Sequence, residues 1–232
     1  MSKLIYVGKT KDVYDNQDGT YTLELKDDAT GKDGVFDPGE NTVGLQIHGL
    51  GRESLRVSKY YFEKLKEAGI PTHYVDCDLE EVTMKVKPVE MFGVGGGLEF
   101  ICRCKADGSF LRRYGGYATF GMDLDYFVEV TLKDDKRQDP PINKDALIRL
   151  EIMDEVQFET CKNLTIQATK LIEEDLNEKG LTLFDLKFEF GLYNGEVLLI
   201  DEISAGCMRV YKDGVKVPPL ELGKFILLRN YQ

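Results

Sequence analysis

Apolar and polar residues alternate along the segment 185–191, and this period of two predicts a β-strand. One face of the strand would carry Leu186, Phe188 and Phe190, and the other Asp185, Lys187 and Glu189. A second apolar run follows at 197–200 and ends at Asp201. Asn194 and Gly195 lie between the two runs, and Asn-Gly is a strong signal for a hairpin turn. The pattern therefore predicts an antiparallel hairpin with an acidic face.

The length of the turn decides which acidic residues share that face, because a slip of one residue sends every side chain to the opposite side. If only Asn194 and Gly195 form the loop, Glu189 pairs with Ile200. If Glu196 joins a bulged loop, Glu189 lies opposite Asp201. We favour the bulged loop, because two facing carboxylates could hold Mg²⁺ together with substrate phosphates. An ordinary hairpin with a solvated outer face is the alternative.

Patterns elsewhere predict further strands and helices, and hence an α+β protein. Strands are expected at 4–14 and 21–25, as a pair at 81–91 and 98–105, and at 126–132. Helices are expected at 53–68 and from Asp154, where Gln157 completes a capping box, to Gly180. Residues 31–51 look like a loop, and residues 220–228 fit a final helix or strand. We expect a β-rich N-terminal subdomain at 1–88, with a phosphate-binding turn, and an α+β subdomain at 89–232, with metal and substrate sites.

Composition excludes several classes of protein. The formal net charge of −11, from 41 acidic and 30 basic residues, argues against a nucleic-acid partner. No apolar run approaches the roughly 20 residues that span a bilayer, so we expect no membrane association. We expect a cytoplasmic location. The five cysteines include no Cys-x-x-Cys pair and there are two histidines, which favours neither a zinc site nor a disulfide framework.

A glycine and two lysines form a predicted turn between strands, in the order Gly8-Lys9-Thr10-Lys11. Glycine allows backbone N–H groups to approach an anion, and the lysines add positive charge, so the turn is a candidate phosphate site. A surface hairpin with solvated lysines is the alternative. The Gly-Lys-Thr string resembles the end of a Walker A loop, but its first glycine is missing and no helix is expected to follow, so we reject that interpretation.

A second candidate anion site combines arginines with a hydroxyl and a glycine turn. It comprises Arg103, Ser109, Arg112 and Arg113. The alternative is a basic stretch of surface. Two charged segments that follow strands, 26–30 and 133–143, carry little weight by themselves, since such clusters are commonly solvated.

Taken in order along nearly the whole chain, these motifs resemble the SAICAR synthetase family, the phosphoribosylaminoimidazole-succinocarboxamide synthases. The resemblance is carried by residues 8–14, 26–30, 70–75, 108–109, 112–115, 133–135, 139–143, 185–191 and 201–204. It implies antiparallel sheets with packed helices and an ATP cleft between two subdomains. It also implies an ATP-dependent ligase of de novo purine biosynthesis, which joins L-aspartate to the carboxylate of carboxyaminoimidazole ribonucleotide through an acyl phosphate. The expected cofactors are ATP and Mg²⁺, the expected partners are these small molecules, and a homodimer is left open.

The resemblance also implies roles for individual residues. Nucleotide binding would fall to Gly8, Lys9, Thr10, Lys11, Lys26, Lys87 and Lys133, and Mg²⁺ binding to Glu189 and Asp201. Substrate binding would fall to Arg103, Ser109, Arg113, Asp139, Asn143 and Arg209, and Lys187 and Arg209 would act in catalysis.

Several segments depart from the family pattern. Pro-Asp usually follows Ser204, where this chain has Ala205-Gly206, so an acidic substrate contact is absent. The family's Arg-Asn-x-Ala-Ala-Gly-Ser becomes Arg-Cys-Lys-Ala-Asp-Gly-Ser at 103–109, a lysine-rich loop is altered at 36–41, and the glycine loop 93–97 looks inserted. These departures support one alternative, a related ligase or phosphotransferase with a different acceptor. A further alternative, an inactive binding or structural protein, is disfavoured because Lys9, Lys187, Glu189 and Asp201 are all retained.

Overall fold

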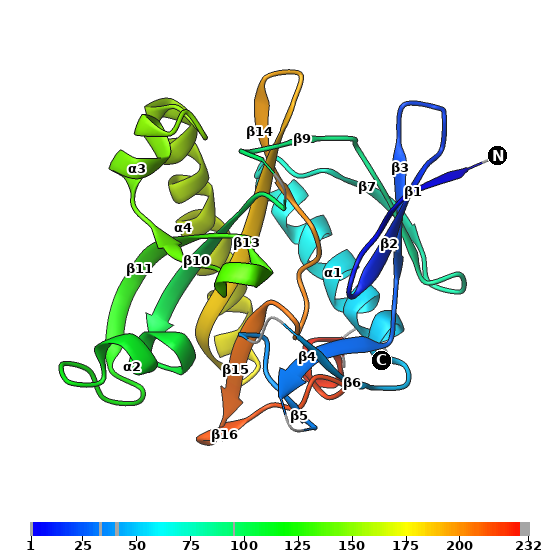
Figure 1. Ribbon diagram of the computed structural model, residues 1–232. Helices are drawn as coiled ribbons and strands as arrows, with labels where there is room; N and C mark the ends of the chain where they lie inside the picture. The colour runs from blue at the N-terminus through cyan, green and yellow to red at the C-terminus, as the bar shows by residue number, and fades with distance from the viewer. Residues whose placement is uncertain (1, 33, 40–41, 95, 228–232) are drawn as a thin grey trace. The chain divides into compact units, whose positions relative to one another are not determined.

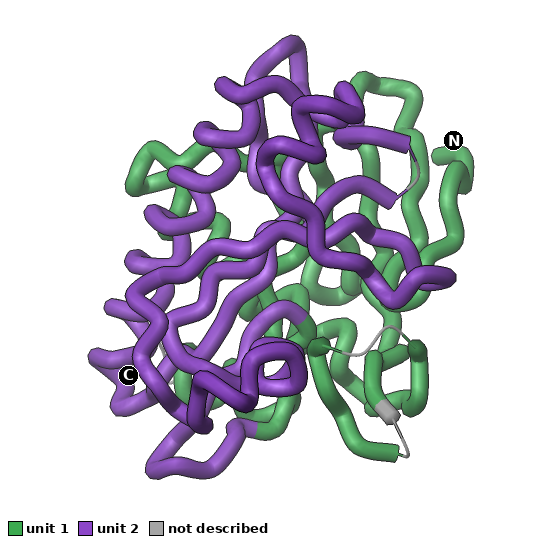
Figure 2. The backbone as a smooth tube through the Cα atoms, turned by 60° about the vertical axis from the view of Figure 1, so that its left-hand side comes forward, with its two compact units in different colours: residues 1–90, 202–206, 218–232 green, residues 91–201, 207–217 purple. Residues whose placement is uncertain are grey.

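The computed structural model describes residues 2–32, 34–39, 42–94 and 96–227, and it has an α+β fold (Figure 1). The chain forms two compact units (Figure 2). The first unit comprises residues 1–90, 202–206 and 218–232, and the second comprises 91–201 and 207–217. Both units are therefore built from segments that are distant in the sequence.

The first unit contains an antiparallel sheet of order β1-β2-β3-β8-β7. Its strands are β1 (Lys3–Val7), β2 (Lys11–Asp15), β3 (Tyr21–Leu25), β8 (Thr83–Val86) and β7 (Tyr74–Asp78). Helix α1 (Leu50–Glu67) packs against β3, β7 and the C-terminal helix α5 (Leu222–Leu227). The apolar face of α1 supplies fully buried residues such as Leu55 and Phe62. Burial of this stripe is what holds the amphipathic helix on the sheet.

Two strand predictions in this unit are wrong in detail. Residues 4–14 form two strands, β1 and β2, because the Gly8 turn reverses the chain. Residues 31–51, expected as a loop, contribute to a small sheet of order β5-β4-β6. Its strands are β4 (Asp28–Lys32), β5 (Val35–Phe36) and β6 (Val43–Gln46). Gly31 lies inside β4, where a Cβ would be 2.2 Å from the Val35 carbonyl oxygen, so this glycine allows the backbones of β4 and β5 to approach closely.

The second unit contains a larger antiparallel sheet of order β12-β11-β10-β13-β15-β16, and β14 also pairs with β13. Its strands are β10 (Leu98–Lys105), β11 (Asp123–Leu132), β12 (Pro141–Ile142), β13 (Thr182–Tyr193), β14 (Glu196–Ile200), β15 (Met208–Lys212) and β16 (Val215–Lys216). The short strand β9 (Glu90–Met91) lies where the chain passes from the first unit to the second. The predicted pairing of 81–91 with 98–105 is wrong, because β8 pairs with β3 and β7 whereas β10 pairs with β11 and β13.

Helix α4 (Glu155–Glu178) packs on β10, β11, β13 and β14 in the second unit. The predicted capping box is confirmed: the Asp154 side chain accepts a hydrogen bond from Gln157 N, and the Gln157 side chain accepts one from Asp154 N. The shorter helices α2 (Gly108–Tyr114), α3 (Lys144–Arg149) and the 3₁₀ turn η1 (Asp135–Arg137) follow the ends of strands. Among the described residues, no helix is both long enough and apolar enough to cross a membrane.

Candidate functional site

The acidic hairpin exists, but its register is not the bulged one that we favoured. Tyr193 pairs with Glu196, and Glu189 therefore pairs with Ile200. Asn194 and Gly195 alone form the turn, with φ values of 52° and 82°. Positive φ at both positions is what a two-residue type I′ turn requires, and Asn-Gly adopts it readily. The local turn chemistry thus outweighs the carboxylate pairing that we expected.

Asp201 nevertheless acts on Glu189, because it lies beyond the end of β14 in a left-handed conformation (φ 74°) and leaves the strand alternation. Burial and the charge of Asp201 raise the pKa of Glu189 from 4.5 to about 7, against the lowering effect of Lys133 and Lys187. The Lys133 Nζ lies 2.6 Å from Glu189 Oε1. The polar side of β13 is therefore buried and not solvated, since Glu189 is only 4% exposed.

Glu99 completes this network, and sequence reasoning missed it. It lies on β10 directly opposite Glu189 on β13 and is buried. Its carboxylate accepts hydrogen bonds from Lys187 Nζ at 2.7 Å and from Thr131 Oγ1 at 3.1 Å. The glutamate in the otherwise apolar run 98–102 was the available signal, because a charged residue in a buried strand requires a partner.

Lys187 carries a positive charge in this setting. Burial lowers its pKa, but the charges of Glu99 and Glu189 outweigh burial and raise the pKa above the ordinary value. The same pairing lowers the pKa of Glu99 in spite of its burial. The carboxyl groups of Glu99, Glu189 and Asp201 thus outnumber the ammonium groups of Lys133 and Lys187, and this excess of acidic groups suits a cation.

The described residues contain no group of three or more His, Cys, Asp and Glu arranged to hold a metal ion. Glu189 and Asp201 could still supply one or two hard oxygen ligands, as is usual for Mg²⁺ that also binds phosphate oxygens. The donor chemistry therefore fits a magnesium ion that is completed by substrate, but it does not form a closed protein cage.

Two of the predicted substrate residues have structural partners. The Asn143 side chain accepts a hydrogen bond from Ala146 N at 2.9 Å and caps α3. The Asp139 carboxylate accepts one from Asp134 N at 2.6 Å. Burial and the charge of Glu99 raise the pKa of Asp139, so this carboxyl belongs to the same electrostatic environment as the Lys187 network.

Of the predicted arginine site, Arg103 is buried and Ser109 is half-buried, whereas Arg112 and Arg113 are exposed, so the surface alternative holds for two of the four residues. The Arg103 side chain is 1% exposed, and its guanidinium donates to Glu129 at 2.9 Å, Asp185 at 3.0 Å and Ser109 Oγ at 2.8 Å. Glu129 also accepts a hydrogen bond from Arg113 at 2.6 Å. Charge-assisted bonds of this kind fix the guanidinium plane.

Arg209 joins the same group through Asp185, whose Oδ2 lies 2.8 Å from Arg209 Nη1. Burial raises the pKa of Asp185, while the charges of Arg209 and Arg103 oppose that shift. We call Arg103, Arg113, Arg209 and Ser109 with their carboxylate partners the arginine cluster. The structure thus brings together four of the six residues that were expected to bind substrate.

The glycine–lysine turn lies in the first unit between β1 and β2, as expected. Gly8 N donates to Lys11 O at 2.9 Å, and a Cβ on Gly8 would lie 2.6 Å from that oxygen, so the tight turn requires glycine. Lys26 Nζ donates to Gly8 O at 3.0 Å and lies 2.5 Å from Asp12. Lys26 N donates to Thr10 O at 2.8 Å. Lys26 therefore stabilises the turn through hydrogen bonds to the carbonyl groups of Gly8 and Thr10.

The remaining predicted residues of this unit are positioned as follows. Lys9 is exposed, whereas Lys11 is half-buried and forms an ion pair with Glu202. Lys87 is half-buried, and its backbone N donates a hydrogen bond to His73 O at 2.8 Å. Of the segments that depart from the family pattern, Glu40, Asn41 and Gly95 lie outside the described residues.

The segment 202–206 also lies in the first unit, where α1 anchors it. Ser58 Oγ donates to Ile203 O at 3.2 Å and accepts from Ile203 N at 3.1 Å. Gly206 N donates to Ser204 Oγ at 3.1 Å. Ala205-Gly206 is thus an ordered part of the fold, although it lacks the acidic side chain that the family pattern has.

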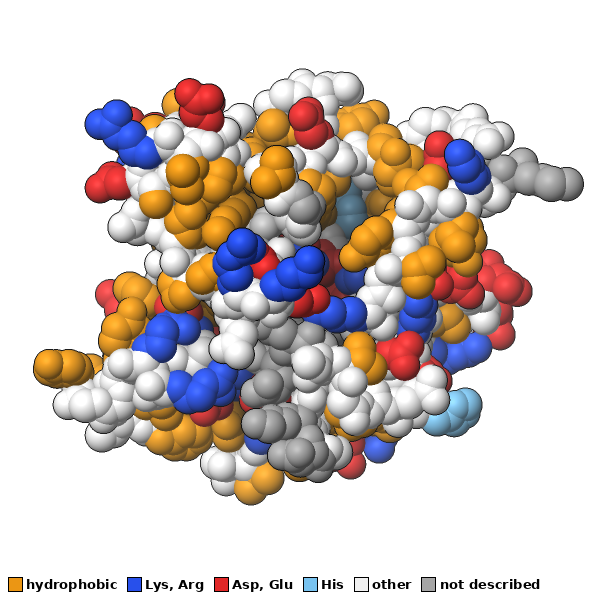
Figure 3. Space-filling view, viewed as in Figure 1, with side chains coloured by type: hydrophobic (Ala, Val, Ile, Leu, Met, Phe, Trp, Pro, Cys, Tyr) orange, Lys and Arg blue, Asp and Glu red, His pale blue; other side chains and the backbone are white. Residues whose placement is uncertain are grey.

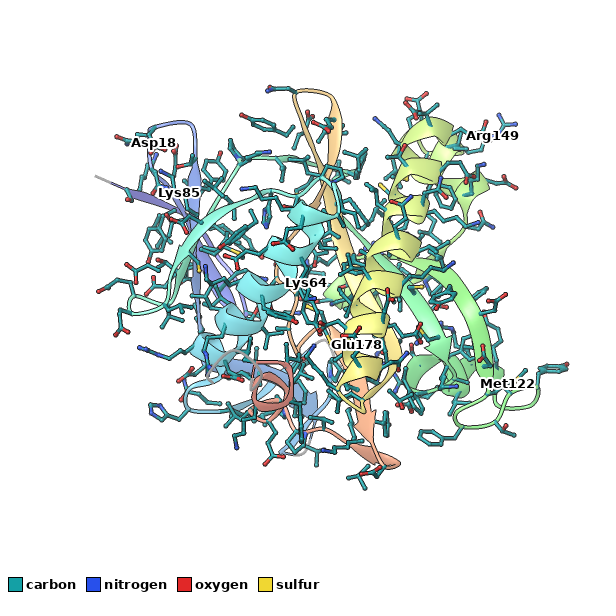
Figure 4. All side chains as sticks on the ribbon, turned by 180° about the vertical axis from the view of Figure 1, so that it is seen from behind. Asp18, Lys64, Lys85, Met122, Arg149 and Glu178 are labelled. Carbon is teal, nitrogen blue, oxygen red and sulfur yellow. The ribbon has the colours of Figure 1, made fainter. Side chains whose placement is uncertain are left out.

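Charged side chains of both signs are mixed on the face shown in Figure 3. A surface pair such as Lys85 and Asp18, 3.0 Å apart, illustrates this pattern (Figure 4).

The glycine–lysine turn and the buried lysine–carboxylate network offer positive charge of the kind that an enzyme acting on phosphorylated substrates needs. The family model "SAICAR synthetase" matches residues 4–221. Phosphoribosylaminoimidazole-succinocarboxamide synthase of Clostridium tetani is 54% identical over 226 residues, which cover 97% of this chain and 99% of that protein. The enzyme of the same name from Thermotoga petrophila is 38% identical over 90% of this chain and 85% of its own length.

Solved structures agree with the sequence comparisons. A SAICAR synthetase determined by structural genomics has a TM-score of 0.78 at 36% identity, over 90% of this chain and 86% of its own. A SAICAR synthetase in complex with ADP has a TM-score of 0.79 at 28% identity, over 91% of this chain and 85% of its own. The chain therefore belongs to the SAICAR synthetase family.

Proposed function

We propose that this protein joins L-aspartate to the carboxylate of carboxyaminoimidazole ribonucleotide at the expense of ATP, as a ligase of purine biosynthesis. The observation that carries the proposal is the match to a named synthase along nearly the full length of both chains. The ADP bound to a solved relative supports the use of ATP. The comparisons do not favour the different acceptor considered above, and an inactive binding protein would not need the buried Lys187 network.

The reaction needs an activated carboxylate, because a carboxylate oxygen is a poor leaving group for an attacking amine. In the proposed first step, an oxygen of the ribonucleotide carboxylate attacks the γ-phosphorus of ATP and ADP leaves. The aspartate amine then attacks the acyl carbon, the bond to the bridging oxygen breaks, and inorganic phosphate leaves with that oxygen while the amine loses a proton. Positioning and charge stabilisation supply most of the catalysis in such transfers.

Lys187 is suited to the first step, because its ammonium stays charged and is oriented by Glu99 at 2.7 Å. It would neutralise negative charge on the transferring phosphoryl group. Glu189 and Asp201 would hold Mg²⁺, which, when bound, neutralises phosphate charge. Lys133 would act on the nucleotide beside Glu189, to which it is already paired.

The other roles follow the predicted groups. Gly8, Lys9, Thr10 and Lys11 would bind ATP phosphates, with Lys26 supporting the turn and Lys87 adding charge toward the nucleotide. Arg103, Ser109, Arg113 and Arg209 would hold the phosphate of the ribonucleotide, and Asp139 and Asn143 would contact substrate near the Lys187 network. A cytoplasmic location and a homodimer are further parts of the proposal; sedimentation of the purified protein tests the second.

Release of ADP tests the proposed function. The purified protein is incubated with Mg²⁺, ATP, the imidazole ribonucleotide and L-aspartate, and each substrate is omitted in turn. We expect ADP and the succinocarboxamide product to appear in equal amounts, with repeated turnover only in the complete mixture; without aspartate, at most one ADP per enzyme molecule should form. Repeated ADP release that does not depend on aspartate, or a complete mixture without the succinocarboxamide, would refute the proposal.

A further inference from the structure

Asp107 connects two parts of the arginine cluster. It is the N-cap of α2, and its Oδ1 accepts a hydrogen bond from Gly108 N at 2.6 Å. Its other oxygen, Oδ2, faces Arg209 Nε at 3.7 Å on strand β15. Asp107 therefore joins the turn that carries Ser109 to the strand that carries Arg209.

Tyr211 fixes the Asp107 carboxylate. Its hydroxyl donates a hydrogen bond of 2.8 Å to Asp107 Oδ2, the same oxygen that faces Arg209. The Tyr211 ring packs against Phe184, with 4.1 Å between ring centroids, and against Phe120. Because the ring is held by aromatic neighbours, the hydroxyl has a defined position. Asp107 thus receives one donor from its own turn and another from β15.

The Arg209 guanidinium is confined on several sides. Its Nη1 donates to Asp185 at 2.8 Å, and its side chain is 7% exposed. Gly108, in a left-handed conformation with φ 52°, lies against the guanidinium, since a Cβ there would be 2.7 Å from the Arg209 Cζ. Asp185 approaches the group at Nη1 and Asp107 approaches it at Nε, and two carboxylates at different edges fix both the position and the plane of the group.

We propose that Asp107 and Tyr211 are positioning residues of the ribonucleotide site, which act by holding Arg209 in the orientation that binds the phosphate. This inference rests on the proposed function, because it takes the phosphate of the ribonucleotide as the ligand of Arg209. Asp107 and Tyr211 act through Arg209 and need not touch the substrate.

The charge of Asp107 and its role in orienting Arg209 lead to opposite expectations for phosphate binding when Asp107 is removed. A carboxylate near a phosphate repels it, so if charge dominated, removal of Asp107 would tighten binding. If orientation dominates, removal would weaken binding, because Arg209 would have to be ordered by the ligand itself. The Tyr211 hydroxyl separates these effects, because Tyr211→Phe loosens the carboxylate without removing its charge.

The test compares Tyr211→Phe, Asp107→Ala and Asp107→Asn with the wild-type protein, and Tyr117→Phe, an exposed tyrosine at 94%, is the matched control. The KM values for the ribonucleotide, ATP and L-aspartate are measured together with kcat. Binding of ribose 5-phosphate, followed by titration calorimetry, gives a readout that does not depend on turnover. Thermal denaturation shows that each variant is folded; Asp107→Asn, which keeps the size and an acceptor oxygen, serves if Asp107→Ala does not fold.

We expect Tyr211→Phe and Asp107→Ala to raise the ribonucleotide KM and the ribose 5-phosphate Kd about tenfold, the effect of one hydrogen bond to a charged group. The KM values for ATP and aspartate and kcat should stay within about twofold, and Asp107→Asn should have a smaller effect on ribonucleotide KM than Asp107→Ala. Unchanged ribonucleotide binding, tighter binding, equal changes in all three KM values, or a wild-type protein that does not bind ribose 5-phosphate would overturn the inference. Absence of aspartate-dependent turnover with ribose 5-phosphate binding intact would refute the proposed function and not the arginine site.

Discussion

Replacement of Glu189 by glutamine should change how the stability of the protein depends on pH. Glu189 is 4% exposed, and burial together with the charge of Asp201 raises its pKa from 4.5 to about 7. The folded protein therefore binds this proton more tightly than the unfolded chain does. Stability that the protonated carboxyl contributes is fully present below about pH 4.5 and is lost as the pH rises through about 7.

The size of the effect follows from the difference between these two pKa values. Each tenfold change in proton affinity corresponds to about 1.4 kcal/mol, so ionisation of Glu189 lowers the free energy of unfolding by about 3 kcal/mol between pH 4.5 and pH 8. Glutamine resembles the protonated carboxyl and does not ionise. In the absence of divalent cations, Glu189→Gln should therefore be more stable than the wild-type protein at pH 8, by up to about 3 kcal/mol.

Urea denaturation in EDTA at several pH values from 5 to about 8 measures this difference. The control is Glu196→Gln, because Glu196 is exposed at the start of β14, next to the hairpin turn. The variant of Glu189 should show a flatter dependence of unfolding free energy on pH, and the control should follow the wild-type protein. If Glu189→Gln keeps the wild-type pH dependence, or is the less stable protein at pH 8, Glu189 does not have a raised pKa that destabilises the folded protein at high pH.

Three further predictions concern other parts of the structure. Lys187→Met should lower kcat by at least about a hundredfold, because it removes a fixed positive charge near the transferring phosphoryl group. The control Lys85→Met, which changes the surface pair with Asp18, should leave kcat unchanged. Steady-state kinetics at saturating substrate concentrations measure both effects. Asp185→Ala should destabilise the protein by about 3–5 kcal/mol, because Arg103 and Arg209 would lose a shared buried partner, and an unchanged urea midpoint would contradict that role. Asp27→Ala should cost about 1 kcal/mol, because Asp27 accepts hydrogen bonds from Gly49 N and Gly51 N at the start of α1. Burial raises the pKa of Asp27, but these bonds outweigh it and the pKa is lowered, so the contribution should be lost as the pH falls below about 4, which acid denaturation of the two proteins would show.

Local sequence signals predicted much of the fold. The Asp154 capping box located the start of α4, and the alternation at 185–191 located β13, because both signals act within a few residues. The partner of a strand is not local information. For this reason the pairing proposed for 98–105 was wrong, and Glu99 was not recognised as the neighbour of Glu189 and Lys187.

The hairpin register shows a different limit. The Asn194-Gly195 signal was present and correct, but a preference for facing carboxylates was given more weight than the turn. In the structure, Asp201 still affects the pKa of Glu189, because Asp201 adopts a left-handed conformation (φ 74°) just after strand β14 ends. Alternation cannot predict such a break. In the arginine cluster, the arginines themselves were predicted, whereas their carboxylate partners lie on other strands and were not.

Transfer of an oxygen atom tests the central claim, activation of a carboxylate by ATP for attack by aspartate. The ribonucleotide is labelled with ¹⁸O in both oxygens of its carboxylate and incubated with the protein, ATP, Mg²⁺ and L-aspartate, and the inorganic phosphate released is analysed by mass spectrometry. The account predicts one ¹⁸O atom in each phosphate molecule and one in each amide product, because the bridging oxygen leaves with phosphate. Phosphate that contains no ¹⁸O, released alongside ADP, would contradict it.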